Sequence, residues 1–100
     1  MRQAFAHDAV LRMAPNADTR APGAAVTLAL CGHWDHEPPC RWPHHTDTDA
    51  RASPARLLTR FSAPPDEVAA VRRRIDEALA DDDRWRVLSS GPEEPHRSRS

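Results

Sequence analysis

The sequence predicts a small α+β domain: a mostly antiparallel sheet of about four strands, one amphipathic helix packed on one face, and a long Cys/His-rich loop. Three observations lead to this prediction. Residues 64–80 carry a helical pattern of apolar side chains. Several short segments have the apolar, alternating pattern that is typical of strands. Residues 35–54 show no periodicity and hold several prolines, as functional or disordered loops do.

Four segments are predicted as strands. Segment 4–13 alternates; a short helix fits it nearly as well, but the turn residues Pro15–Asp18 that follow favour the strand. Segment 25–34 is apolar and β-branched between turn residues, so we expect a strand there too. Segments 56–61 and 85–88 complete the sheet. With the helix between them, these last two allow a β-α-β unit with a right-handed crossover.

The predicted helix has a distinct start and a distinct apolar face. Proline suits the first turn, as at Pro64-Pro65, and Asp66 and Glu67 there complement the helix dipole. The apolar residues that share one face are Val68, Val71, Ile75, Ala78 and Leu79. The polar residues of the opposite face, which we expect to be solvated, are Arg72, Arg73, Asp76 and Glu77. We expect the helix to end near Asp81.

The chain length makes room for one domain, which we predict over residues 1–89. Residues 90–100 contain no large apolar side chain and are expected to form a disordered tail. Large apolar side chains are few and alanine is abundant, so the predicted core is thin. A metal, a disulfide or a partner chain is therefore expected to add stability.

The charges nearly balance: Lys and Arg total 14, Asp and Glu total 15, and the formal net charge is −1. This leaves no overall basic field to attract nucleic acid or an anionic membrane. The longest apolar stretch, residues 24–31, is far shorter than the ~20 residues that span a bilayer. The first residues lack a secretory apolar region. We therefore expect no nucleic-acid partner, no membrane association and a cytoplasmic location, where thiols stay reduced.

The segment from Cys31 to His45 concentrates residues of the kinds that bind metals. It holds both cysteines and four of the six histidines. Zinc favours four thiolate and imidazole ligands in a tetrahedral arrangement. Alternation places Cys31 and His33 on one side of the predicted strand, and Cys40 and His44 return from the loop. The preferred ligands are Cys31, His33, Cys40 and His44, with His36 and His45 as substitutes.

Zinc is the first cofactor expected, copper(I) the second, and nickel or iron(II) follow. The ligand spacing matches no standard zinc finger, and an inert Cys/His-rich loop is the main alternative. In that alternative Cys31 is a small buried side chain, or it forms a disulfide with Cys40 if the protein is exported. His7 lies far from this segment and is expected to play no role.

Three functions are consistent with these residues. The preferred one is a small zinc protein in which a structural metal site supports an interaction surface on the loop. The second is a metal-dependent enzyme with an open coordination position, where Asp35 or Glu37 acts as general base. The third is a metal-free interaction or accessory module. It would contact another protein, or a second copy of itself, through the sheet edge, the strand Arg56–Arg60 or the helix.

Overall fold

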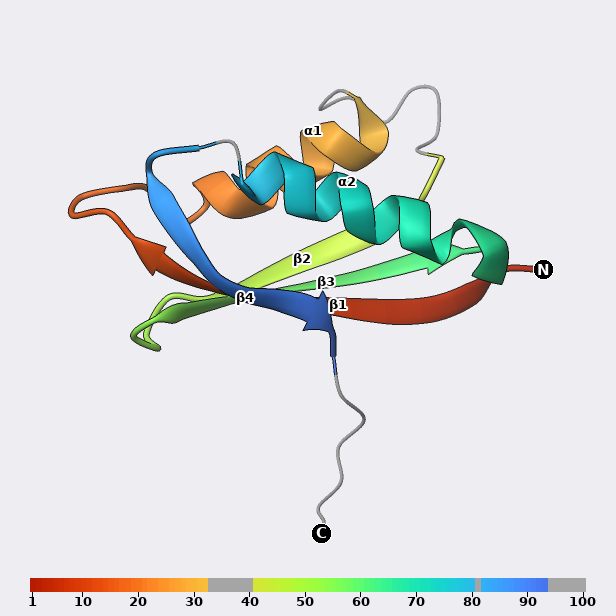
Figure 1. Cartoon of the computed structure of the whole chain (residues 1–100), viewed down its shortest axis with the longest axis horizontal. Helices are drawn as coiled ribbons and strands as arrows, with labels where there is room; N and C mark the ends of the chain where they lie inside the picture. Colours follow the sequence, from red (N-terminus) through yellow and green to blue (C-terminus); the bar gives the residue numbers. More distant parts are fainter. Residues whose placement is uncertain (33–40, 81, 94–100) are drawn as a thin grey trace, which may run out of the picture.

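The computed structural model describes residues 1–32, 41–80 and 82–93. These residues form four strands, two α-helices and one short 3-10 helix (Figure 1). In chain order the elements are β1 (Gln3–Met13), α1 (Ala21–Cys31), β2 (His44–Asp49), β3 (Ala55–Ala63), the 3-10 helix η1 (Pro65–Glu67), α2 (Val68–Ala80) and β4 (Trp85–Pro92).

The strands form one antiparallel sheet in the order β2-β3-β1-β4. Because β1 pairs antiparallel with both β3 and β4, these two strands run parallel to each other on either side of it. By the same reasoning β1 and β2 run parallel on either side of β3. Two split β-α-β units of this kind make up the β-α-β-β-α-β topology of ferredoxin-like folds. The predicted small α+β fold with a four-strand antiparallel sheet is confirmed.

Both helices lie on the same face of the sheet, as Figure 1 shows. The core fills the space between them and the sheet, with Leu11 and Leu57 buried on the strands and Val26 buried on α1. Helix α2 contributes the apolar stripe that its sequence predicts; the buried residues of this stripe are Val71, Ile75 and Leu79. The helix layer therefore covers one face of the sheet, which we call the covered face.

Helix α1 replaces the strand predicted over residues 25–34, so the prediction of a single helix is wrong. Pro22 occupies the first turn of α1, and Gly32 ends the helix with a left-handed φ of 82°. Pro22, Val26 and Leu30 are buried at a spacing of four residues, which is a helical period. The β-branched, apolar composition favoured a strand, but the proline and glycine at the two ends were the better signals.

Strand β2 forms within the segment predicted as a loop over residues 35–54, which corrects that part of the prediction. Its half-buried side chains are His44, Thr46 and Thr48, and its exposed side chains are His45, Asp47 and Asp49. This alternation is visible in the sequence, but polar residues carry it, so a search for apolar periodicity misses it. Residues 33–40 lie outside the described residues, and the long Cys/His-rich loop is not confirmed.

Strands β1, β3 and β4 and helix α2 form at the predicted places. Strand β4 continues beyond the predicted end at residue 88 and includes Pro92. Ser90, Gly91 and Pro92 pair with β1, so this part of the segment predicted as a tail belongs to the sheet. Residues 94–100 lie outside the described residues, and the division of the chain into a domain and a tail stays a prediction.

Candidate functional site

The structure brings two of the predicted metal ligands together. Cys31 is the last residue of α1 and His44 is the first residue of β2, with Cys31 Sγ 3.7 Å from His44 Nδ1. His45, a predicted substitute, points to the opposite face of β2 because side chains alternate along a strand. The remaining candidates, which lie outside the described residues, are His33, Asp35, His36, Glu37 and Cys40.

The predicted metal-binding function is wrong for the part of the chain that the structure describes. Within residues 1–32, 41–80 and 82–93, no group of three or more His, Cys, Asp or Glu side chains is placed to hold a metal ion. The full ligand set and the zinc cofactor stay untested predictions, because half of that set lies outside these ranges. The described geometry therefore supports no metal chemistry.

The contacts of Cys31 and His44 have a structural explanation. Cys31 is disulfide-bonded, and a disulfide sulfur is not the thiolate that zinc binds. His44 Nε2 lies 3.1 Å from Thr27 Oγ1, and His44 Nδ1 lies 3.1 Å from the carbonyl oxygen of Trp42. The contact with Thr27 joins the start of β2 to α1, and the contact with Trp42 is local to the segment that leads into β2.

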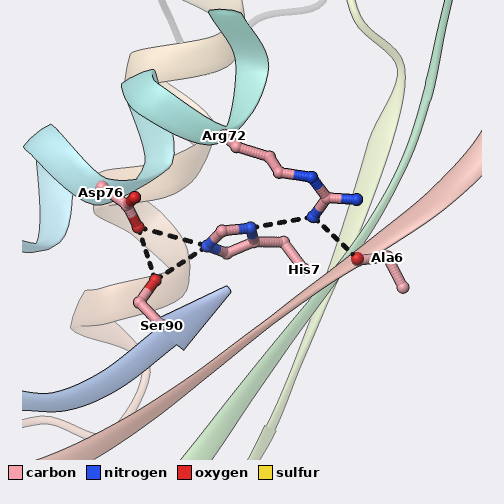
Figure 2. A network of polar contacts seen from close by, with 5 residues as sticks. All are labelled: Ala6, His7, Arg72, Asp76 and Ser90. Carbon is pink, nitrogen blue, oxygen red and sulfur yellow. Dashed lines mark hydrogen bonds and ion pairs between the residues drawn. The ribbon is translucent and has the colours of Figure 1, made fainter. Parts of the chain in front are cut away.

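A second group of polar side chains, which we call the His7 cluster, lies between the sheet and α2 (Figure 2). Its members are His7, Arg72, Asp76 and Ser90. Strand β1 places the His7 side chain on the covered face, where it is only 2% exposed. Arg72 and Asp76 stand one turn apart on α2, and Ser90 comes from β4. Three elements that are distant in the sequence thus meet at one imidazole ring.

Both nitrogens of the His7 ring have polar neighbours, as Figure 2 shows. Nδ1 lies 3.0 Å from Arg72 Nη1, which also donates to the carbonyl oxygen of Ala6 at 2.9 Å. Nε2 lies 2.8 Å from Ser90 Oγ and 3.2 Å from Asp76 Oδ1. The Ser90 hydroxyl also donates to the same Asp76 oxygen. The buried ring therefore has a partner at each nitrogen.

The identity of these partners decides which nitrogen carries the proton. A guanidinium group only donates, so His7 Nδ1 must accept from Arg72. In the neutral ring Nε2 then carries the hydrogen and donates toward Asp76 and Ser90. Burial lowers the pKa of His7 below its ordinary value of 6.5, although the carboxylate of Asp76 opposes this shift. His7 is therefore a neutral ring at neutral pH.

The His7 cluster contains the residue types of a serine–histidine–aspartate catalytic site, but its geometry differs. In such a site the serine and the carboxylate bind different ring nitrogens, whereas here Ser90 and Asp76 share Nε2. Because Nε2 carries the proton, it cannot accept one from Ser90. The arrangement thus satisfies a buried ring and ties α2 to β1 and β4, and it does not activate a nucleophile.

The structure corrects the expectation that His7 plays no role. The sequence held one signal, because His7 falls in the alternating series that places Phe5, Ala9 and Leu11 toward the core. A histidine in such a series needs hydrogen-bond partners when it is buried. The sequence did not reveal those partners, since they lie 65 to 83 residues further along the chain.

The opposite side of the sheet, which we call the uncovered face, has none of the described helices over it (Figure 1). Side chains alternate between the two faces of a strand, so the residues on either side of each buried strand residue belong to the uncovered face. They are Ala4, Ala6, Asp8, Val10 and Arg12 of β1; His45, Asp47 and Asp49 of β2; Arg56, Leu58, Arg60 and Ser62 of β3; and Arg86, Leu88 and Ser89 of β4.

The centre of the uncovered face is partly apolar. Val10 and Leu58 are half-buried there, and Leu88, at a bulge in β4, is 40% exposed. Arg56 on β3 reaches Asp8 on the neighbouring β1, with Nη2 2.7 Å from Oδ2. This ion pair neutralises two of the charges that border the apolar centre.

The rim of the uncovered face carries charges of opposite sign on its two sides. Asp47 and Asp49 lie on the outer strand β2, and Asp49 also accepts the backbone N–H of Arg51. Arg12 and Arg86 lie directly opposite each other on β1 and β4. None of these four rim charges takes part in the ion pairs that the described residues form. The face thus has an acidic edge and a basic corner.

A hollow of the surface lies where the start of α1 meets β2, and two arginines line it. Arg20 pairs with Asp18, and Arg84 pairs with Asp82. The hydrogen bond from Arg84 lowers the pKa of Asp82 to about 2. Because both guanidinium groups have local carboxylate partners, this hollow offers a ligand less charge than the rim of the uncovered face does.

Among the described residues, no helix is both long enough and apolar enough to cross a membrane. Comparison of the chain with models of protein families, with curated proteins and with solved structures finds no match. Function is therefore inferred from the residues and their geometry, since a fold by itself does not imply a function.

Proposed function

We propose that the protein is an interaction module that binds another protein through the uncovered face of its sheet. The observation that carries this proposal is the pattern of that face: a partly apolar centre, with Asp47 and Asp49 on one side and Arg12 and Arg86 on the other. Protein interfaces combine an apolar centre with a polar rim, and complementary charges fix their orientation. The partner is expected to present an apolar centre and rim charges of both signs.

The composition of the uncovered face favours a protein partner over a nucleic acid. Single-stranded nucleic acids stack on aromatic side chains, and the uncovered face as defined above has no Phe, Tyr or Trp, with His45 as its one aromatic ring. The described phenylalanines and tryptophans belong to the core or pack against it; they are Phe5, Trp42, Phe61 and Trp85. Aspartates accompany the arginines on this face, so it also lacks the basic field that phosphates require. We expect neither a nucleic acid nor a membrane as the partner.

The cytoplasmic location that the sequence predicts stays a prediction. The disulfide of Cys31 argues for an oxidising compartment instead, because cytosolic thiols are kept reduced. Labelling of free thiols in intact cells that make the protein distinguishes these two locations.

Site-directed photo-cross-linking tests the proposed function. A photo-reactive amino acid replaces Arg60, which is exposed on the uncovered face, or Arg73, which is exposed on α2 as the matched control. We expect irradiation of cells to yield a discrete protein adduct from position 60 and not from position 73. Leu58→Arg should abolish that adduct, since the substitution puts a charge into the apolar centre. No adduct from position 60 above the control, with the chain folded, would overturn the proposal.

A further inference from the structure

We propose that the partner is a second copy of this chain, and that the two copies pack with their uncovered faces together around a two-fold axis. This inference rests on the proposed function and names its partner. A symmetric pair needs one surface that is complementary to itself. The uncovered face meets this condition because its acidic edge and its basic corner lie on opposite sides.

The order of the strands determines which edges meet. The sheet order β2-β3-β1-β4 puts the acidic strand β2 at one edge and β4, with Arg86, at the other. A two-fold axis that runs along the strands, between the two sheets, places β2 of each copy over β4 of the other. In this arrangement Arg86 of the second copy lies two residue positions along the strand from Asp49 and four from Asp47, so Asp49 is the nearer carboxylate. The two-fold axis places this approach at two sites in the pair.

The rim charges also disfavour the other simple orientation. A two-fold axis across the strands would place β2 of one copy over β2 of the other. The four carboxylates of Asp47 and Asp49 in the two copies would then meet without a cation from the opposite edge. Like charges that face each other across an interface oppose association, so the charge pattern selects the arrangement with β2 over β4.

The centre of the face fits a sheet-on-sheet contact. Packing two sheets about 10 Å apart brings the inward side chains of both into one layer. That layer would bury Val10, Leu58 and Leu88 of each copy. Asp8 and Arg56 already pair within each copy, so closing the interface over them leaves neither charge without a partner.

The size of the face is of the order that a stable pair requires. Four strands at a spacing of about 4.8 Å make a sheet about 19 Å wide, and a strand of nine residues is about 30 Å long. The flat footprint is therefore roughly 570 Å² at this strand spacing, before the relief of the side chains is included. Stable interfaces bury about 800 Å² on each partner.

A charge-exchange experiment tests the second copy and its orientation together. One variant carries Asp47→Arg and Asp49→Arg, and the other carries Arg12→Asp and Arg86→Asp. Each variant alone should dimerise roughly 100-fold more weakly than the wild-type chain, because like charges now meet at both ends. An equimolar mixture should regain the dimer, with one copy of each variant, since the β2 edge of each copy then meets a basic or acidic corner of opposite sign. Sedimentation equilibrium gives the masses, and circular dichroism confirms that each variant is folded.

The outcomes separate this inference from the proposed function. A wild-type chain that stays at its single-chain mass of 11.2 kDa at every concentration overturns the second copy as partner. Folded variants that stay monomeric when mixed overturn it too. In either case an adduct between position 60 and a different protein in the cross-linking experiment would leave the interaction module in place.

If the exchanged charges prevent folding, the neutral variants Asp47→Asn/Asp49→Asn and Arg12→Gln/Arg86→Gln replace them. Each should dimerise roughly tenfold more weakly, and unchanged affinity in both would overturn the arrangement.

Discussion

The two faces of the sheet hold charged and polar side chains in different ways. On the covered face, His7 is buried and finds Arg72, Asp76 and Ser90 within the same chain. On the uncovered face, Arg56 and Asp8 pair at the centre, whereas the rim charges form no ion pair with the described residues. The covered face uses its polar groups to hold the fold together, whereas the rim charges of the uncovered face are left to solvent in the single chain and to a partner in the proposed interface.

This difference follows from the access of water to each face. A polar group that is buried without a partner costs free energy, so the fold must satisfy His7 internally. An exposed carboxylate or guanidinium is hydrated, so the folded chain incurs no desolvation cost when no protein group contacts it. Substitutions on the covered face should therefore change stability, and substitutions on the uncovered face should change association.

Two adjacent leucines on β3 give the largest expected contrast. Leu57 is 1% exposed on the covered face, and Leu58 is half-buried on the uncovered face. Leu57→Ala should lower the free energy of unfolding by about 3 kcal/mol because it leaves a cavity in the core. Leu58→Ala should lower it by less than about 1 kcal/mol. Urea denaturation at dilute concentration, where the monomer dominates, measures both, and equal losses would contradict the distinction between the faces.

Removal of Arg72 from the His7 cluster should have the next largest effect. Arg72→Met keeps most of the side-chain length but removes the donor to His7 Nδ1 and to the carbonyl oxygen of Ala6. We expect a loss of about 1–3 kcal/mol in the free energy of unfolding, since two acceptors lose their partner. The control is Arg73→Met on the exposed face of α2, which should change it by less than about 0.5 kcal/mol. A control loss as large as that of Arg72→Met would show that the cluster does not stabilise the fold.

The His7 cluster should also make stability depend on pH. Because burial lowers the pKa of His7 in the folded chain, the unfolded chain binds more protons between that pKa and 6.5. The free energy of unfolding should therefore fall as the pH drops below 6.5, by at most about 1.4 kcal/mol per pH unit from this group. Well above 6.5, where the ring is neutral in both the folded and the unfolded chain, the contribution of His7 should be constant.

The variant His7→Gln isolates this effect, because an amide does not titrate. Denaturation curves at several pH values between about 5 and about 8 should show a steeper acid-side decline for the wild-type chain than for the variant. Parallel declines in the two proteins would mean that His7 has the same pKa in the folded and the unfolded chain.

The ion pair at the centre of the uncovered face should give the smallest effect on the isolated chain. The side chains of Arg56 and Asp8 are 55% and 22% exposed, so water screens their attraction. A double-mutant cycle with Arg56→Ala and Asp8→Ala should give a coupling of only about 0.2–1 kcal/mol at dilute concentration. A coupling of several kcal/mol in the monomer would show that this face contributes to folding as the covered face does.

The sequence predicted those elements whose periodicity is carried by apolar residues. Helix α2 and strands β1, β3 and β4 fall into this class. Helix α1 was missed because its composition favoured a strand, although its buried stripe has a spacing of four residues. Strand β2 was missed because threonine, aspartate and histidine carry its alternation. Its polar outward side chains are nevertheless the ones that the proposed interface uses.

The candidate site was harder to predict than the fold, for a physical reason. The density of cysteine and histidine between residues 31 and 45 is a local property of the sequence, and the predicted metal function relied on it. The His7 cluster and the uncovered face depend on strand order, which joins residues far apart in the chain. The local density of cysteine and histidine therefore predicted a site at Cys31 and His44, whereas strand pairing across the sheet determines the geometry of the His7 cluster and of the uncovered face.

Sedimentation equilibrium of the wild-type chain and of Leu58→Arg, combined with urea denaturation, tests the central claim most directly. Leu58 lies opposite Asp47 on β2 and Asp8 on β1, so a new arginine has two acidic neighbours and the monomer should stay folded. We expect the wild-type mass to approach twice the chain mass of 11.2 kDa with rising concentration, and the variant to keep the single-chain mass with little loss of stability. A wild-type chain that never exceeds its single-chain mass, or a variant that dimerises equally well, would contradict the account.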